Sequence, residues 1–352
     1  MLAKAEIAID PSGTDALAQI VAEVGYPTDL PLALLARLAD GRHWSYTAGT
    51  APNGAAITTR HRFYAASVSK QITAAGIALL VQDGALTTED TVARWLPELP
   101  AWTHDIRLHH LLHHTSGMPE HEPLEQRVRA LGDPNWTTPS VMAVLQAWDA
   151  ADGFTAPGSA YAYSNAAYIC LAQIIERASG QPLQAFADAR IFAPLGMHDS
   201  AYWSGPEPFP AGERVVPMTL TESGAPLTLG DGGVWTTVED LTRWNESLLP
   251  QVDALGITTL LHTTTPYASG AAADYAWGIR LYEHRGQLAQ SHGGAWMGVN
   301  AKVVRLPQVG SGAGAGAHFA FQVLLHDVDR VTALTDRVLD LLIDTADGNA
   351  AD

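Results

Sequence analysis

The sequence predicts an α+β fold: one antiparallel sheet built from both ends of the chain, flanked by N- and C-terminal helices, with a mostly helical lobe inserted between. Two observations lead to this prediction. Strand patterns lie near both ends of the chain, and helical patterns separated by loops fill its middle. We therefore expect a discontinuous sheet lobe, residues 1–85 plus 265–352, and a helical lobe, residues 86–264, with a functional cleft between them.

The composition is typical of a folded globular protein. Hydrophobic residues make up 47% and charged residues 16% of the 352 positions, far from the composition of a disordered chain. The formal charge of −17 argues against nucleic acid or an anionic membrane as a partner, because like charges repel. Met1 to Pro11 lacks the apolar core of a signal peptide, which favours a cytoplasmic location. The single cysteine, Cys170, excludes an internal disulfide and is expected to be buried.

The first elements are predicted to be a helix and two strands. Thr14 to Val24 has helical periodicity, and Leu32 to Leu38 and Trp44 to Ala48 have strand character. Asp40-Gly41 between the strands favours a hairpin turn. Ser67 to Gln82 then places apolar residues at helical spacing and is followed by an Asp-Gly pair that can end a helix. We expect a buried helix that begins at a serine.

The rest of the chain changes from helices to strands. The helical patterns, with Pro or Gly at most junctions, are Thr91 to Leu96, Leu108 to His113, Pro139 to Ala150, Tyr168 to Ala178, Leu183 to Ile191 and Val238 to Leu248. Strand patterns follow at Ala276 to Tyr282, Gly298 to Leu306 and Phe319 to Leu325, before a helix from Val331 to Ile343. The Gly310 to Ala317 run has Gly-x-Gly spacings, but no helix follows it, so a hairpin tip is expected rather than a dinucleotide-binding loop.

A reactive serine is predicted at Ser67 because Lys70 follows it by three residues. Residues i and i+3 share a helix face, so the ammonium can reach the hydroxyl. Only three of the 20 basic residues are lysines, and an amine can lose its proton where a guanidinium cannot. Free N–H groups at a helix N-terminus also favour negative charge that develops near Ser67. Ser-x-x-Lys alone is a short pattern, so the assignment depends on the motifs that accompany it.

Two further motifs contribute candidate partners. Tyr163 and Asn165 stand two residues apart in a loop and can point the same way, and a nearby ammonium would lower the pKa of the phenol. His292-Gly293-Gly294 follows in the strand-rich region, where glycines permit close approach of a substrate. The next amide, at Ala295, can donate to an oxyanion together with the Ser67 amide. The alternatives are a Tyr and an Asn that end a loop, and an ordinary Gly-Gly turn.

In this order, Ser-x-x-Lys, Tyr-x-Asn and His-Gly-Gly resemble the three motifs of the serine β-lactamase and penicillin-binding protein superfamily. The sequence is most similar to the branch of class C β-lactamases, D-aminopeptidases and family VIII esterases, because the second motif is Tyr-x-Asn rather than Ser-x-Asn. No Glu-x-x-Leu-Asn segment, typical of class A, is present. Further similar segments are Phe63 to Ala66, Leu111 to Met118, Pro157-Gly158, Gly230 to Gly233 and Trp235 to Thr237.

The resemblance implies a β-lactamase/transpeptidase-like fold and a serine hydrolase that forms a covalent acyl-enzyme. It implies a small-molecule ester or amide as the partner, with no cofactor and no metal, and it leaves the oligomeric state open. The roles that it implies are Ser67 as nucleophile, Lys70 and Tyr163 as the shared base, Asn165 as a contact to the substrate amide, Ser67 and Ala295 as oxyanion donors, and His292, Gly293 and Gly294 as substrate-binding residues.

The third motif departs from the family pattern. His292-Gly293-Gly294 stands where typical β-lactamases carry Lys-Thr-Gly or Lys-Ser-Gly, whose lysine and hydroxyl help to hold the substrate carboxylate. A histidine with a pKa of about 6.5 is mostly neutral at pH 7. We therefore expect an esterase or a D-aminoacyl amidase or peptidase with weak or no β-lactamase activity. A true β-lactamase or DD-peptidase is the alternative. A binding protein without catalysis would not need Ser67, Lys70 and Tyr163 together.

Two other features of the sequence have some character of a functional site. A histidine cluster has pairs at the i, i+4 spacing of a helical metal site, but no following Glu completes a zincin motif. We predict a structural loop with solvent-facing imidazoles at His104, His109, His110, His113, His114 and His121. Asp231 can line the cleft, although aspartates are common in turns. The Gly-x-Ser-x-Gly elbow of α/β-hydrolases is absent.

Overall fold

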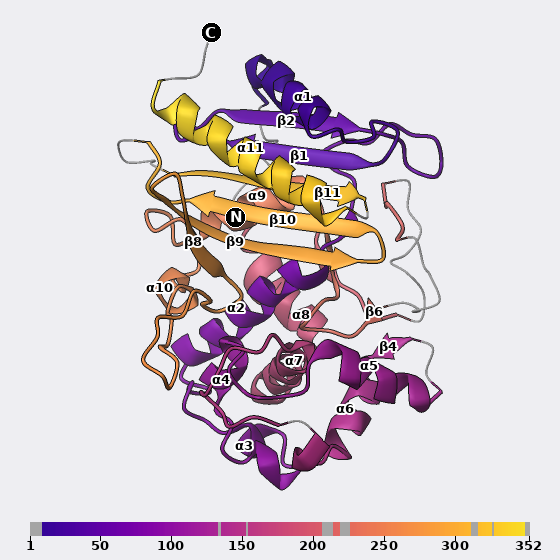
Figure 1. Cartoon of the computed structure of the whole chain (residues 1–352), viewed down its shortest axis with the longest axis vertical. Coiled ribbons are helices and arrows are strands. Elements are labelled where there is room, and N and C mark those ends of the chain that lie inside the picture. The colour runs from indigo at the N-terminus through magenta and orange to yellow at the C-terminus, as the bar shows by residue number, and fades with distance from the viewer. Residues whose placement is uncertain are drawn as a thin grey trace.

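The computed structural model describes residues 9–132, 135–152, 154–205, 214–218, 226–310, 316–325 and 327–348. Its main feature is a six-stranded antiparallel sheet in the order β2-β1-β11-β10-β9-β8, which joins the two ends of the chain (Figure 1). The strands are β1 (Leu32–Arg37), β2 (His43–Ala48), β8 (Arg280–His284), β9 (Gln287–Trp296), β10 (Val299–Leu306) and β11 (Ala317–Leu324). The antiparallel pairing of β1 with β11 joins the N-terminal strands to the C-terminal strands of the sheet.

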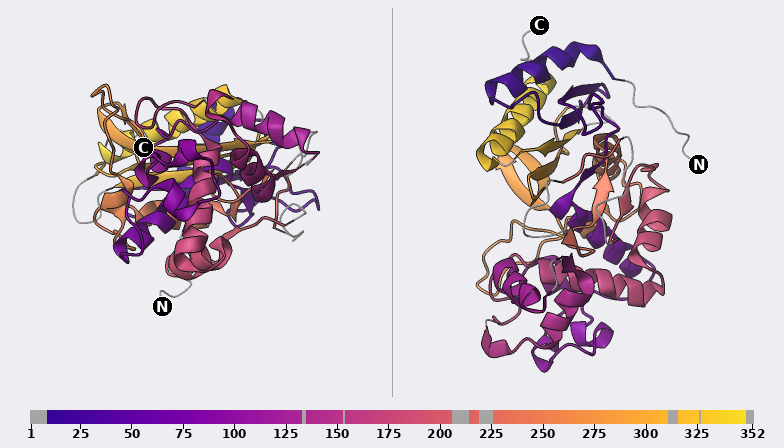
Figure 2. Two further views of the ribbon diagram at one scale, coloured as in Figure 1. Left: turned by 90° about the horizontal axis from the view of Figure 1, so that it is seen from below. Right: turned by 90° about the vertical axis from the view of Figure 1, so that its right-hand side faces the viewer.

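The two faces of the sheet are covered by different helices. α1 (Thr14–Glu23) and α11 (Val328–Ala346) lie together on one face, where Glu23 and Arg337 form an ion pair (Figure 2). Successive strand residues point to opposite faces of the sheet. Val304 and Phe321 pack on the face that α1 and α11 cover, whereas Val303 belongs to the core on the opposite face. α9 (Val238–Ser247) covers that opposite face, and the Asn245 side chain donates to the Phe319 carbonyl at 2.8 Å.

Helices fill the region below the sheet in Figure 1. At their centre, α2 (Ser69–Gln82) packs against α7 (Asn165–Ser179). The buried residues of α7 are mainly apolar, whereas α2 also buries Ser69, Lys70, Gln71 and Thr73 at its N-terminal end. The other helices are α3 (Val92–Trp95), α4 (Leu108–Leu112), α5 (His121–Ala130), α6 (Thr138–Gln146), α8 (Leu183–Ala187) and α10 (Thr258–Leu261). Short strands form β3-β7-β5 (Phe63–Tyr64, Val234–Thr236, Ala201–Tyr202) and β4-β6 (Trp136–Thr137, Pro226–Leu227).

The predicted fold class is confirmed, and most predicted elements lie within a few residues of those observed. β9 was missed as a strand because its Gln-Ser-His-Gly-Gly stretch has low strand propensity, and pairing with β10 overrides that preference. α5 was missed because it is mainly polar, with Leu124 and Val128 as its buried residues. The division into lobes at residues 85/86 and 264/265 stays a prediction, and the Gly310 to Ala317 run falls mostly outside the described residues.

The segment predicted to begin β8 forms a turn instead. The Ala276 N–H donates to the Ile279 carbonyl at 2.7 Å, and Gly278 has a φ of 70°. A Cβ at Gly278 would stand 3.0 Å from the backbone of Lys70 and Gln71, so the turn packs tightly against the start of α2. β8 therefore begins only at Arg280. Across the described ranges, none of the helices combines the length and hydropathy that crossing a membrane requires.

Candidate active site

Ser67 lies in a single 3₁₀ turn, η2 (Ala66–Val68), which leads directly into α2. The predicted helix therefore begins two residues later than expected. Ala66 has a φ of 45°, a left-handed conformation that costs a residue with a side chain roughly 1–3 kcal/mol. β7 holds this conformation, because the Ala65 N–H donates to the Val234 carbonyl and the Val234 N–H donates to Ser69 Oγ. The strained turn places Ser67 just before the N-terminal end of α2.

The Lys70 side chain is fully buried, and its ammonium has three hydrogen-bond acceptors. Nζ lies 3.1 Å from Ser67 Oγ, 2.8 Å from Asn165 Oδ1 and 2.8 Å from the Asp231 carbonyl oxygen. Burial lowers the pKa of Lys70 to about 7, and the negative charge of Asp231 opposes this shift. At neutral pH the residue is therefore poised between ammonium and amine, so it can both accept and return a proton.

Tyr163 lies on the other side of Lys70, with the ammonium 4.8 Å from the centre of its ring. Burial raises the pKa of Tyr163, and a hydrogen bond to Ser67 opposes this rise. The lowering of the phenol pKa that the sequence suggested is not found, because the loss of hydration on burial outweighs the hydrogen bond to Ser67 and the attraction of Arg280. Tyr163 is thus a neutral phenol that can donate its proton.

The loop before α7 brings Tyr163 and Asn165 to the same site. Ser164 caps the helix, accepting from the Ala167 N–H, and its hydroxyl donates to the Pro119 carbonyl. The Asn165 amide bridges two groups, since its oxygen accepts from Lys70 and its nitrogen lies 3.2 Å from His121 Nδ1. Alternation along this loop therefore places both residues beside Lys70, as the sequence predicted.

His114 is a residue of the site that the sequence analysis assigned to a structural loop rather than to the active site. Its ring is fully buried, lies 4.2 Å from the Tyr163 ring between centroids, and accepts a hydrogen bond from the Ser164 N–H at Nδ1. His113 is also buried and contacts two backbone carbonyls. The prediction of solvent-facing imidazoles is therefore wrong for these two residues. Within the described ranges, no group of three or more His, Cys, Asp or Glu is arranged to hold a metal ion.

The third motif lies on β9 at a point where that strand has one open edge. β8 pairs with β9 only as far as Ser291, so the residues that follow pair with β10 alone and face η2. A Cβ at Gly294 would stand 2.2 Å from the Ala65 oxygen and 2.8 Å from the Ser67 nitrogen. Glycine is therefore needed at this position for the strand to approach the serine. Ala295, the other predicted oxyanion donor, is the next residue along this edge.

His292 is nearly buried and has partners for both ring nitrogens. Nδ1 lies 2.7 Å from the Gly293 carbonyl oxygen, so it carries the proton, and Nε2 accepts from the Tyr275 hydroxyl at 2.9 Å. Burial, reinforced by the positive charge of Lys70, lowers the pKa of His292 to about 3. The imidazole is therefore neutral at pH 7, as its place in the motif suggested.

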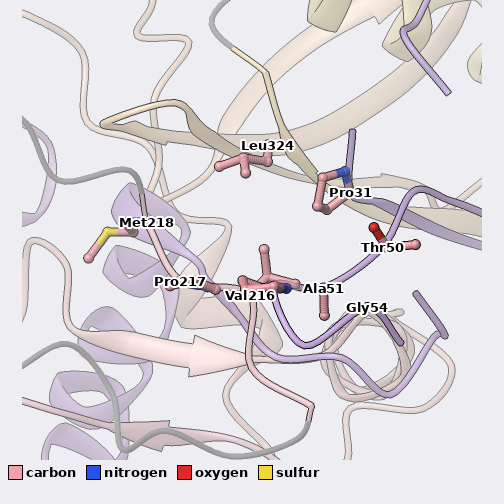
Figure 3. A pocket seen from close by; sticks show the side chains of 9 residues that line it. Pro31, Thr50, Ala51, Gly54, Val216, Pro217, Met218 and Leu324 are labelled. Atoms are coloured by element: carbon pink, nitrogen blue, oxygen red, sulfur yellow. The ribbon is translucent and has the colours of Figure 1, made fainter. Parts of the chain in front are cut away.

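A pocket of about 220 Å³ opens in front of Ser67. Its lining includes Tyr163, Tyr275, His292, Arg280 and Lys302. A larger cavity of about 440 Å³ lies elsewhere, between Pro31, Ala51, Val216, Pro217 and Leu324 (Figure 3). It is lined mainly by apolar side chains and contains none of the predicted catalytic residues. The smaller pocket, which contains Ser67 and Tyr163, is therefore the candidate active site.

The chain is similar in sequence to known proteins. The chain is 30% identical over 276 residues to penicillin-binding protein 4* of Bacillus subtilis, a match that covers 71% of this chain and 59% of the relative. It is 29% identical over 238 residues to the esterase EstB of Burkholderia gladioli, covering 53% of this chain and 56% of the relative. The chain thus spans less than two thirds of the length of these relatives.

Solved structures share the whole fold. The D-amino acid amidase of Ochrobactrum anthropi SV3 superimposes with a TM-score of 0.76 at 22% identity, over 94% of this chain and 99% of the amidase. A penicillin-binding protein from Bacillus halodurans gives a TM-score of 0.74 at 21% identity, over 92% and 98% of the two chains. The beta-lactamase family model matches residues 17–322, which include every predicted site residue, and the chain therefore belongs to the beta-lactamase family.

Proposed function

We propose that this chain is a serine hydrolase that forms a covalent acyl-enzyme on Ser67 and hydrolyses small esters or amides. The observation that carries the proposal is the 3.1 Å contact between Ser67 Oγ and Lys70 Nζ, with the amine buried and its pKa lowered to about 7. A lysine with an ordinary pKa would stay protonated and could not activate a hydroxyl. Membership of the beta-lactamase family supports the same chemistry.

The proposed reaction has two stages. The Lys70 amine accepts the Ser67 proton while Oγ attacks the substrate carbonyl, and the amides of Ser67 and Ala295 stabilise the oxyanion. The neutral phenol of Tyr163 donates a proton to the leaving oxygen or nitrogen and regains one from the lysine ammonium. Water then attacks the acyl-enzyme, with the same groups acting in reverse. Asn165 contacts the acyl amide of the substrate.

We infer that the substrate is an ester or a D-aminoacyl amide rather than a β-lactam. The neutral His292, bonded to Tyr275, offers no permanent charge where typical β-lactamases carry a lysine. An esterase from Burkholderia gladioli and a D-aminopeptidase from Brucella anthropi are among the relatives, which supports this preference. A true β-lactamase or DD-peptidase is the second candidate, favoured by the similarity to penicillin-binding protein 4*.

The test combines labelling with a comparison of substrates. A fluorophosphonate should add one phosphonyl group per chain, and peptide mapping by mass spectrometry should place it on Ser67. Rates on p-nitrophenyl acetate, D-alanyl p-nitroanilide and nitrocefin should show turnover of the ester or the D-amide, with nitrocefin the slowest. Absence of labelling and of all turnover would contradict the hydrolase assignment, and nitrocefin as the fastest substrate would favour the second candidate.

Gly294→Ala should reduce the rate of acylation by about a hundredfold or more, the loss typical of a displaced oxyanion donor. Its Cβ would stand 2.2 Å from the Ala65 oxygen and 2.8 Å from the Ser67 nitrogen, so β9 must move away from η2. Gly293→Ala adds the same methyl group at the neighbouring position, which also lines the pocket, but its Cβ would meet only ordinary contacts, the nearest 3.6 Å from Lys302. This variant therefore measures the effect of a smaller pocket without a displacement of β9. Stopped-flow labelling of both variants measures the effect, with thermal unfolding as a check on folding. Equal rates in the two variants would show that β9 does not contribute an oxyanion donor.

A further inference from the structure

His121, the first residue of α5, contacts the Asn165 amide at the end that does not face Lys70. Its Nδ1 lies 3.2 Å from Asn165 Nδ2, while Asn165 Oδ1 accepts a hydrogen bond from Lys70 Nζ at 2.8 Å. The same ammonium lies 3.1 Å from Ser67 Oγ. A single amide group therefore joins His121 to the lysine that contacts the reactive serine, and the proposed mechanism gives this histidine no role.

The two ends of the Asn165 amide fix the direction of both hydrogen bonds. A lysine ammonium has donors only, so the end of the amide that faces Lys70 is the oxygen. The amide nitrogen then faces His121 and donates to it, which makes Nδ1 the acceptor. A neutral imidazole that accepts at Nδ1 carries its proton on Nε2. The orientation of Asn165 and the tautomer of His121 therefore depend on each other.

Three side chains surround the His121 ring. Nε2 lies 3.7 Å from Glu125 Oε2, one helical turn further along α5, where the carboxylate attracts the Nε2 proton. The rings of Trp136 and Trp296 lie 5.0 Å and 5.5 Å away between centroids, at interplanar angles of 64° and 82°. Trp136 is buried, and Trp296 is the last residue of β9. The imidazole is thus held between two indoles, although 34% of its side chain is exposed.

We propose that His121 is a positioning residue that holds the Asn165 amide in the orientation in which its oxygen binds Lys70. This inference rests on the proposed hydrolase function. An amide without an acceptor at its nitrogen can rotate, because the terminal torsion of an asparagine has broad energy wells. Lys70 would then lose an ordered acceptor and would be held less firmly beside Ser67 Oγ. The second N–H of Asn165 stays available for the acyl amide of the substrate.

The experiment compares two substitutions of His121 that differ in one property. His121→Gln keeps a side-chain oxygen that can accept from Asn165, whereas His121→Leu keeps most of the bulk without an acceptor. kcat/KM for p-nitrophenyl acetate is measured from pH 5 to 9 in the wild type and in both variants. We expect its upper level to fall by about fivefold or more in His121→Leu, the loss typical of one hydrogen bond, and to stay within about twofold in His121→Gln.

The pH profile separates positioning from a general loss of structure. The Asn165 oxygen stabilises the charged form of Lys70, so a disordered amide should lower the pKa of Lys70. The acid limb of the profile should therefore move to lower pH in His121→Leu and stay in place in His121→Gln. A smaller folded fraction would lower the whole profile without moving this limb.

His104→Leu is the matched control, because it makes the same change at an exposed histidine that does not line the pocket in front of Ser67. Its profile should match that of the wild type. Equal profiles in His121→Leu and His121→Gln, or a fall in His121→Leu without a shift of the acid limb, would overturn the inference. Absence of turnover of p-nitrophenyl acetate by the wild type, with no labelling of Ser67, would instead contradict the hydrolase function itself.

Discussion

Ser67→Ala should abolish hydrolysis of every ester that the wild-type chain turns over, with kcat falling on the order of 10⁴-fold or more. The reason is that Ser67 Oγ is the hydroxyl oxygen among the three hydrogen-bond partners of Lys70 Nζ. Ser69 is the nearest serine in sequence, but it is fully buried and its Oγ accepts a hydrogen bond from the Val234 N–H at 3.1 Å. Steady-state kinetics on p-nitrophenyl acetate measure the loss.

Two controls separate loss of the nucleophile from loss of the fold. The thermal unfolding midpoint of Ser67→Ala should stay close to that of the wild type, because Lys70 keeps its contacts with Asn165 and the Asp231 carbonyl. The variant should also take up no phosphonyl label. Residual turnover within tenfold of the wild type, or a label that maps to Ser69, would show that Ser67 is not the nucleophile.

Lys70→Arg should be almost as damaging as Lys70→Ala, although it keeps the positive charge. A guanidinium cannot release a proton at accessible pH, so it cannot accept the proton of Ser67. We expect both variants to retain less than about a tenth of the wild-type kcat, a loss of more than ~1.4 kcal/mol in transition-state stabilisation. Arginine activity close to that of the wild type would mean that the lysine acts by charge alone.

The pH dependence of the wild type gives an independent measurement of the same residue. The pKa of Lys70 is about 7, and the neutral amine is the form that can act as base. kcat/KM should therefore fall as the pH drops below about 7, where the amine becomes protonated, and should reach its upper level above that value. Lys70→Ala should lose this dependence. A wild-type profile that is flat from pH 5 to 9 would argue against lysine as the base.

The proximity of the candidate catalytic residues within each motif could be predicted from the sequence because the relevant spacings are local, whereas the roles proposed for them come from the resemblance to the family. Ser67 and Lys70 are three residues apart in one helical segment, and Tyr163 and Asn165 are two apart in one loop, so backbone geometry alone brings each pair together. The strand patterns at both ends and the helical patterns between them determined the fold class in the same way, because periodicity reports which face of each element is buried.

Only the tertiary structure decided how these pairs meet and what charge they carry. Asn165 and Asp231 are distant from Lys70 in sequence, and their contacts depend on the packing of α2 against α7 and on the loop that contains Asp231. The burial that lowers the pKa of Lys70 and raises that of Tyr163 is likewise a result of packing. No local pattern encodes it, because desolvation depends on which distant segments cover a side chain. The same holds for the pocket in front of Ser67, whose lining comes from segments that are distant in the sequence, such as Tyr163 and Tyr275.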